Sequence, residues 1–139
     1  MENHGYQHYR EQQGQNILEM SQNELLMALL DELVKQLLRC ELALTHQNFE
    51  LLDDSADRAL AILRHLDDTL DMQYAISHDL HRLYDFFSYE LSRVKIGRNK
   101  GELDKVKPML IDLRDTFRTA SKNVAEGRGG EVPAQQGNG

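Results

Sequence analysis

Residues 52–70 read LDDSADRALAILRHLDDTL and carry the pattern that decides the fold. Apolar side chains recur there at intervals of four, three, four, three and four residues: Leu52, Ala56, Ala59, Leu63, Leu66 and Leu70. This spacing places them along one side of an α-helix, as in the seam of a helical bundle. Residues 50–72 carry seven acidic side chains against two arginines. We therefore predict a helix from about residue 50 to residue 72, with one face in a core and an acidic outer face.

Three further segments show helical spacing of apolar residues: 21–44, 74–96 and about 102–124. The connections between the four segments are short, at about 45–49, 72–74 and 97–101. Short connections make consecutive helices antiparallel neighbours. We therefore predict an all-α fold, an antiparallel up-down-up-down four-helix bundle over residues 21–124.

Two end segments lack this pattern. Residues 1–20 are polar except for a few side chains such as Tyr6 and Tyr9, and we expect a flexible N-terminal arm. Residues 125–139 are rich in glycine and glutamine, which predicts a disordered C-terminal tail.

Local signals refine the helix ends. Ser21 and Glu24 have the spacing of a capping box at the start of the first helix. Gly97 is well placed to cap the third helix at its end. Pro108 allows two interpretations of the last helix, which either begins near Lys105 with the proline in its first turn or is kinked at the proline.

Composition excludes several classes of protein. The 139 residues correspond to one domain, and the net charge of −7 argues against general nucleic-acid binding. Cys40 is the only cysteine, so we expect no intramolecular disulfide and a reducing, cytoplasmic location. The longest apolar run is six residues, far below the roughly 20 that a membrane span needs, so we expect no membrane insertion. The first residues do not have the pattern of a secretory signal.

Catalytic and metal-binding patterns are weak. The di-metal site of ferritin-like bundles needs Glu-x-x-His pairs, and the chain contains none. His78, His81 and Asp85 share one helix face and could hold zinc or nickel, but the spacing is a weak signal and we interpret them as solvated polar side chains opposite the apolar stripe of the helix. We interpret Cys40 as a packed thiol, since no histidine lies at helical spacing from it. We therefore expect no catalytic residue, no resident metal and no cofactor.

Two charged groups are interpreted as solvated surface. The acidic group lies at the end of the second helix and comprises Asp67, Asp68 and Asp71. The basic group surrounds the last connection and comprises Lys95, Arg98, Lys100, Lys105 and Lys107.

The first helix has more apolar surface than one bundle seam requires. Its leucines and valine form two columns, at positions 25/29/33/37 and 26/30/34/38. The second column either widens the core or lines a groove for an amphipathic helix of a partner. Tyr6 and Tyr9, in an otherwise polar arm, would suit a movable cover for such a groove.

Five stretches, taken in order, resemble the FliS family of flagellar export chaperones, over about residues 6–122. They are residues 6–9 (YQHY), 21–31 (SQNELLMALLD), 59–71 (ALAILRHLDDTLD), 83–91 (LYDFFSYEL) and 113–117 (LRDTF). Three positions depart from the family's usual residues: Gln22 replaces a proline, Leu30 a tyrosine and Phe117 a tryptophan.

The resemblance implies a non-enzymatic, cytoplasmic chaperone that binds the disordered C-terminal segment of flagellin before export. It also implies that the N-terminal arm contacts the export gate or covers the groove. We expect partner contacts at Tyr6, Tyr9, Leu25, Leu26, Leu29, Leu30, Leu33, Tyr84 and Phe87, although the helical ones could equally be core residues. Two alternatives remain: a metal-binding bundle, or a structural bundle that forms a homodimer through the surplus apolar column.

Overall fold

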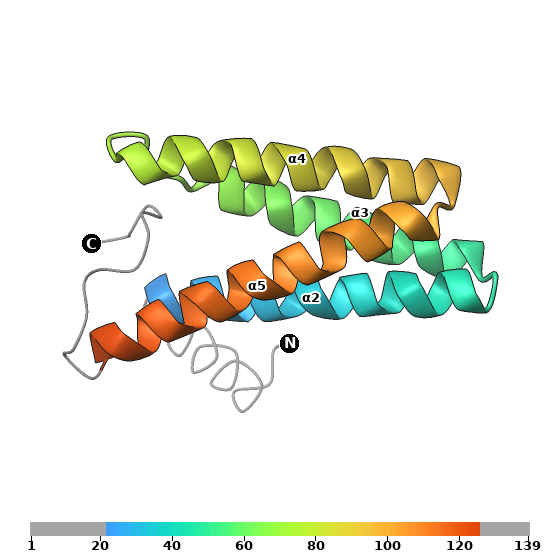
Figure 1. The fold of residues 1–139 in the computed structure, drawn as a ribbon, viewed down its shortest axis with the longest axis horizontal. Helices are drawn as coiled ribbons and strands as arrows, with labels where there is room; N and C mark the ends of the chain where they lie inside the picture. Colours follow the sequence, from blue (N-terminus) through green and yellow to red (C-terminus); the bar gives the residue numbers. More distant parts are fainter. Residues whose placement is uncertain (1–21, 126–139) are drawn as a thin grey trace, which may run out of the picture.

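The computed structural model describes residues 22–125, which form four α-helices (Figure 1). They are α2 (Gln22–Thr45), α3 (Phe49–Asp68), α4 (Ala75–Gly97) and α5 (Lys100–Ala125). The predicted all-α four-helix architecture is confirmed over this range. Ser21 with its predicted capping box, the N-terminal arm and the C-terminal tail lie outside the described residues.

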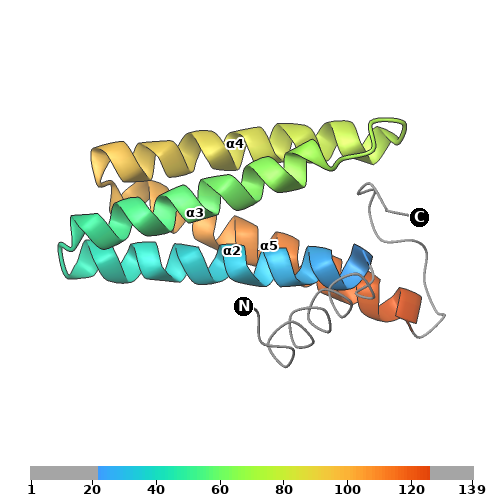
Figure 2. The same ribbon diagram turned by 180° about the vertical axis from the view of Figure 1, so that it is seen from behind.

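The helices form a closed ring: consecutive helices pack against each other, and the last packs against the first. Helix α2 packs against α3, α3 against α4, and α4 against α5, and α5 returns to pack against α2. The α2–α3 pair shares the most contact and the α4–α5 pair the least. The start of α2, the end of α3, the start of α4 and the end of α5 lie at one end of the bundle (Figures 1 and 2).

The core occupies the axis of the bundle. Its largest fully buried side chains are Tyr84, Phe87 and Phe117, together with leucines from all four helices. The six seam positions of α3 and the turn after it are all buried: Leu52, Ala56, Ala59, Leu63, Leu66 and Leu70. Burial of a leucine-sized side chain contributes about 1.5–3 kcal/mol, so this seam is the main reason that the segment folds as predicted.

Helix α3 ends earlier than predicted, at Asp68 rather than near Met72. The hydroxyl and the N–H of Thr69 both donate to the carbonyl oxygen of His65, and the hydroxyl also reaches that of Leu66. The bond from the Thr69 N–H to His65 is still a regular helical bond. The carbonyl oxygen of Leu66 accepts from the Thr69 hydroxyl, and the N–H of Leu70, its regular helical partner, donates instead to Asp67 at 3.2 Å. Leu70 still reaches the core, which explains why its spacing continued the helical pattern.

The caps differ in part from those expected. The Asn48 side chain accepts a hydrogen bond from the N–H of Leu51 and caps α3. Gly97 is the last residue of α4, and the cap position predicted for it is taken by Arg98, which adopts the left-handed conformation with φ of 50°. The Arg98 guanidinium lies 3.6 Å from the centre of the Phe49 ring, a contact that offsets the backbone strain.

Pro108 lies inside α5, eight residues after its start at Lys100. The helix begins earlier than expected because the Asn99 side chain accepts a hydrogen bond from the N–H of Glu102. The interpretation with the proline in the first turn is therefore wrong.

Candidate functional site

An open groove of about 270 Å³ lies between α4 and α5. It is lined by Leu83 and Phe87 from α4 and by Met109, Asp112, Leu113 and Thr116 from α5. The two helices are close at the loop that joins them and move apart towards the other end of the bundle, as α5 crosses towards α2 (Figure 1). The lining is mostly apolar, with polar side chains on the α5 wall.

Ion pairs along α5 explain why this helix leans towards α2. Lys107 donates a hydrogen bond of 2.7 Å to Glu41, and both Arg114 and Arg118 pair with Asp31. The ion pairs between α4 and α5 lie near the loop that joins them. There, Arg93 pairs with Glu102 at 3.3 Å. Ion pairs therefore join α5 to α2 between Lys107 and Arg118, and join α5 to α4 only near the loop.

The groove leaves apolar side chains accessible. Met109 is 40% exposed, and Leu83 and Leu113 are half-buried. Ile76 lies seven residues before Leu83, which puts it on the same side of α4, and it is 45% exposed. Apolar side chains that stay accessible within a concave surface are typical of a binding site for a partner.

A second, smaller pocket lies between the start of α2 and the end of α3. It is lined by Gln22, Leu25, Leu26, Leu29, His65, Leu66 and Thr69. Leu25 and Leu29 are half-buried. On the turn between α3 and α4, at the same end of the bundle, Met72 is 45% exposed and Tyr74 is 52% exposed.

The predicted partner-binding residues fall into four groups. Leu25, Leu26 and Leu29 lie together in the small pocket, and Phe87 lies in the larger groove although its ring is fully buried. Leu30, Leu33 and Tyr84 belong to the core. Tyr6 and Tyr9 lie outside the described residues.

Three apolar residues of the groove were missing from the sequence-based prediction: Leu83, Met109 and Leu113. Leu83 and Leu113 belong to the apolar stripes of their helices, and nothing in the stripes marks the positions where the helices separate. Met109 lies outside the stripe of its helix, and an apolar residue at such a position was the available signal.

Two glutamates on α4 and α5 form a compact charged cluster beside the closed end of the groove. Glu90 is 3% exposed, and Arg93 and Lys105 lie within 4.0 Å of its carboxylate. A hydrogen bond with Glu102 and burial raise the pKa of Glu90, while the same hydrogen bond lowers the pKa of Glu102. The pair therefore shares one proton between the helices more readily than two separate glutamates would.

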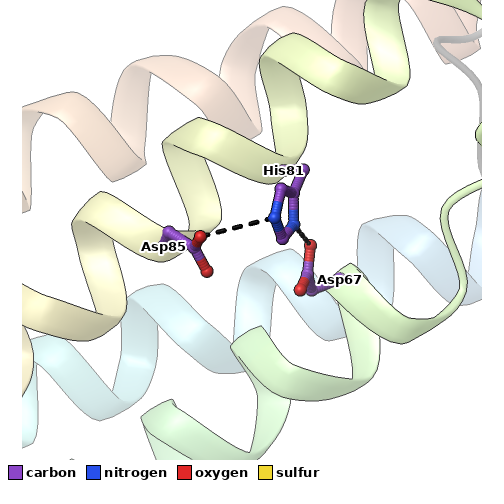
Figure 3. A group of neighbouring side chains, drawn as sticks. All are labelled: Asp67, His81 and Asp85. Carbon is purple, nitrogen blue, oxygen red and sulfur yellow. Dashed lines mark hydrogen bonds and ion pairs between the residues drawn. The ribbon is translucent and has the colours of Figure 1, made fainter.

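A histidine lies between two carboxylates where α3 and α4 meet (Figure 3). His81 Nδ1 is 2.6 Å from Asp67 Oδ1, and Nε2 is 3.4 Å from Asp85 Oδ2. The hydrogen bond with Asp67 is the largest cause of a raised pKa for His81, followed by the charges of Asp67 and Asp85. Asp67, which the sequence suggested was solvated surface, is the residue of this cluster that was missed.

The same cluster bears on the metal-binding alternative that the sequence left open for His78, His81 and Asp85. Asp67, His81 and Asp85 offer donor atoms within 4.8 Å of one another. The carboxylates face different ring nitrogens, so a single ion bound to one nitrogen leaves the other carboxylate as a hydrogen-bond acceptor only. His78 does not join the group, because its Nε2 faces the carbonyl oxygen of Met72 at 3.1 Å.

The basic residues around the last connection have acidic or aromatic neighbours. Lys95 contacts Asp57, Lys100 contacts Asp104, and Lys107 contacts Glu41. Lys105 faces Glu90 and Glu102, and Arg98 covers Phe49. The positive charges of this group therefore face acidic or aromatic side chains of the same chain, on another helix or, for Lys100, within α5 itself. The Cys40 thiol is buried, which confirms the prediction of a packed cysteine.

Comparison with known proteins gives one family. The family described as flagellar protein FliS matches residues 3–124, which is most of the chain. No curated protein matches the chain. No helix among residues 22–125 has both the length and the apolar character that a membrane crossing requires.

Proposed function

The chain belongs to the FliS family of flagellar export chaperones, and from this membership we propose that it binds the C-terminal segment of flagellin in the cytoplasm. The bound segment becomes helical and packs in the groove between α4 and α5. Binding covers the surface that flagellin uses to polymerise and keeps the subunit in an export-competent state.

The observation that carries this proposal is the groove itself. It presents accessible Leu83, Met109 and Leu113 between two helices that are close only near their common loop. An amphipathic helix placed there would complete the apolar packing that α5 gives up by leaning towards α2.

The energetics call for a longer contact than the groove alone. Each residue of a disordered partner loses about 1–2 kcal/mol of backbone entropy when it is ordered. Apolar burial returns about 25 cal/mol per Å², so an extended contact is needed. The pocket at Leu25 and Leu29 and the exposed Met72 and Tyr74 lie at the open end of the bundle. We propose that the segment continues from the groove over this turn to the pocket.

The N-terminal residues have a separate proposed role. The arm that contains Tyr6 and Tyr9 covers the accessible apolar surface when flagellin is absent, or contacts the export gate. Deletion of residues 1–15 is expected to leave the helical circular-dichroism signal unchanged. Loss of the helical signal would contradict a removable cover.

Calorimetric titration with a synthetic peptide of the last ~50 residues of the organism's flagellin tests the main proposal. We expect a 1:1 complex, a gain of helicity by the peptide and a negative heat-capacity change. No binding at high peptide concentration would contradict it. Light scattering of the same sample would then test the homodimer through the apolar column of α2.

Two exposed positions give a matched pair of variants. Met109→Glu places a charge in the groove, whereas Leu42→Glu places one on an α2 side chain outside both pockets that is 52% exposed. We expect Met109→Glu to weaken peptide binding at least tenfold and Leu42→Glu to leave it within a factor of two. Equal effects of the two variants would contradict the assignment of the groove.

A further inference from the structure

The contact between α3 and α4 includes a clamp made by Asp67, His81 and Asp85. Asp67 belongs to α3, and the other two belong to α4 (Figure 3). Both ring nitrogens of His81 face carboxylate oxygens, at 2.6 and 3.4 Å. A carboxylate only accepts hydrogen bonds, so both contacts are satisfied together only when the imidazole carries two protons. The clamp is therefore complete in the protonated state alone.

The clamp lies on the part of α4 that forms one wall of the groove. His81 is two residues before Leu83, and helical geometry turns the two side chains about 160° apart from each other, to different neighbours of α4. Contacts of His81 with α3 thus fix the position of α4, and with it the position of Leu83 in the wall of the groove. Near the loop to α5, two ion pairs hold α4: Lys95 with Asp57 of α3, and Arg93 with Glu102 of α5. The clamp holds the opposite half of the helix.

We propose that the Asp67–His81–Asp85 clamp is a proton-operated latch that holds the first half of α4 against α3 and so keeps the α4–α5 groove open. This regulation rests on the proposed function, since the groove it controls is the proposed flagellin site. When His81 is neutral, one ring nitrogen loses its proton and one carboxylate contact is lost. Leu83 and Met109 then gain by approaching each other, and the groove narrows.

The charged groups around His81 set the pH at which the latch works. Asp67 faces it from α3, and Asp85 and Arg82 act on it from α4. The two carboxylates raise the pKa of His81 above its ordinary value of 6.5, and Arg82 opposes them. Below pH 6.5, His81 is therefore protonated, the clamp is complete and the groove is open. As the pH rises through the raised pKa, one contact is lost and the groove narrows.

The width of the groove can be measured without flagellin. Ala75 and Thr119 are exposed, near the start of α4 and the end of α5. Cysteines at these positions carry spin labels, while the buried Cys40 thiol stays unlabelled in the folded protein. We expect the distance between the labels to shorten as the pH rises through the pKa of His81, followed by the NMR signal of its imidazole.

Two histidine variants separate the latch from general effects of pH. His81→Gln has no charge to lose, so the distance between the labels should not change with pH. His78→Gln removes an exposed histidine outside the clamp and should behave as the native protein does. A label distance that stays constant while His81 titrates would overturn the latch. A pKa of His81 at or below 6.5 would also overturn it.

Binding of the flagellin peptide gives the functional readout. We expect about fivefold tighter binding at pH 6 than at pH 8 in the native protein, at the lower end of typical coupling between sites. In His81→Gln, the ratio of the two affinities should fall to the value that titration of the peptide's own groups produces. Equal pH dependence of the two proteins would overturn the latch. Absence of binding at every pH would contradict the proposed function, and the label distances would still decide on the latch.

Discussion

Lys107 of α5 and Glu41 of α2 form a hydrogen bond of 2.7 Å between two half-buried side chains that are 66 residues apart in the chain. Together with the pairs that Arg114 and Arg118 make with Asp31, it attaches α5 to α2 at several points along its length. The helix is thereby held away from α4, where the groove lies.

This attachment has a measurable energy. In a double-mutant cycle of Lys107→Ala and Glu41→Ala, we expect a coupling of about 0.5–1 kcal/mol in urea unfolding, as is typical of partly exposed ion pairs. Lys100 and Asp104, an exposed pair within α5, serve as the comparison and should couple more weakly. A smaller coupling for Lys107 and Glu41 than for that pair would show that α5 is held by apolar packing alone.

Two leucines of α2, one from each apolar column, should differ sharply in stability tests. Leu33 is fully buried, so Leu33→Ala should lower the free energy of unfolding by about 2–5 kcal/mol. Leu38 is about half-exposed, and Leu38→Ala should change it by about 0.5 kcal/mol or less. Urea denaturation followed by circular dichroism measures both. A loss of similar size in the two variants would place Leu38 in an interface that the single chain does not show.

Glu90 should make stability depend on pH. Its pKa is raised in the folded protein, so it favours folding at pH values below its ordinary pKa of 4.5, and this contribution is lost as the pH rises through the raised value. Glu90→Gln keeps a hydrogen-bond donor for Glu102 and carries no charge. The variant should lose less stability than the native protein between pH 4.5 and 7 in thermal melts. Parallel melting curves over this range would show that Glu90 titrates normally.

Cys40 should be unreactive in the folded protein. Burial raises the pKa of its thiol to about 11, so at pH 8 about one thiol in a thousand is ionised. With Ellman's reagent, we expect no reaction within minutes in buffer and one equivalent at once in 6 M guanidinium. Fast reaction in buffer would reveal local opening of the core around Cys40.

Pro108 should limit the stability of α5. Proline within a helix lacks one backbone donor and clashes with the preceding turn, at a cost of up to about 3 kcal/mol. Pro108→Ala should therefore raise the midpoint of urea unfolding. A lowered midpoint would mean that the shape the proline gives to α5 is needed for its packing.

The sequence predicted the helices well because their apolar spacing depends on local geometry. It predicted the ends less well, since Thr69 stops α3 through its own hydroxyl and Arg98, in place of Gly97, takes the left-handed turn. Thr69 acts on carbonyls only three and four residues away, which the apolar spacing does not reveal. The turn at Arg98 is accompanied by a contact with Phe49, which joins residues 49 positions apart.

The candidate site was harder to predict. Leu30 and Leu29 are adjacent in the same apolar pattern, yet one is buried in the core and the other borders a pocket. The difference arises from how α2 is rotated between α3 and α5. The groove arises from the angle between α4 and α5, which distant ion pairs set. Neither quantity is encoded in the periodicity of a single helix.

The ring of helix pairs also has a consequence for the way the chain folds. Three of the four pairings join consecutive helices and can form as soon as each hairpin closes, while only the return of α5 onto α2 joins distant parts of the chain. Helical bundles with such local topology fold in about microseconds to milliseconds. The closing step brings Lys107 to Glu41 and creates the divergence of α4 from α5. A chain that is still being synthesised therefore acquires the hairpin of α2 and α3 early, and the groove is the last feature to appear.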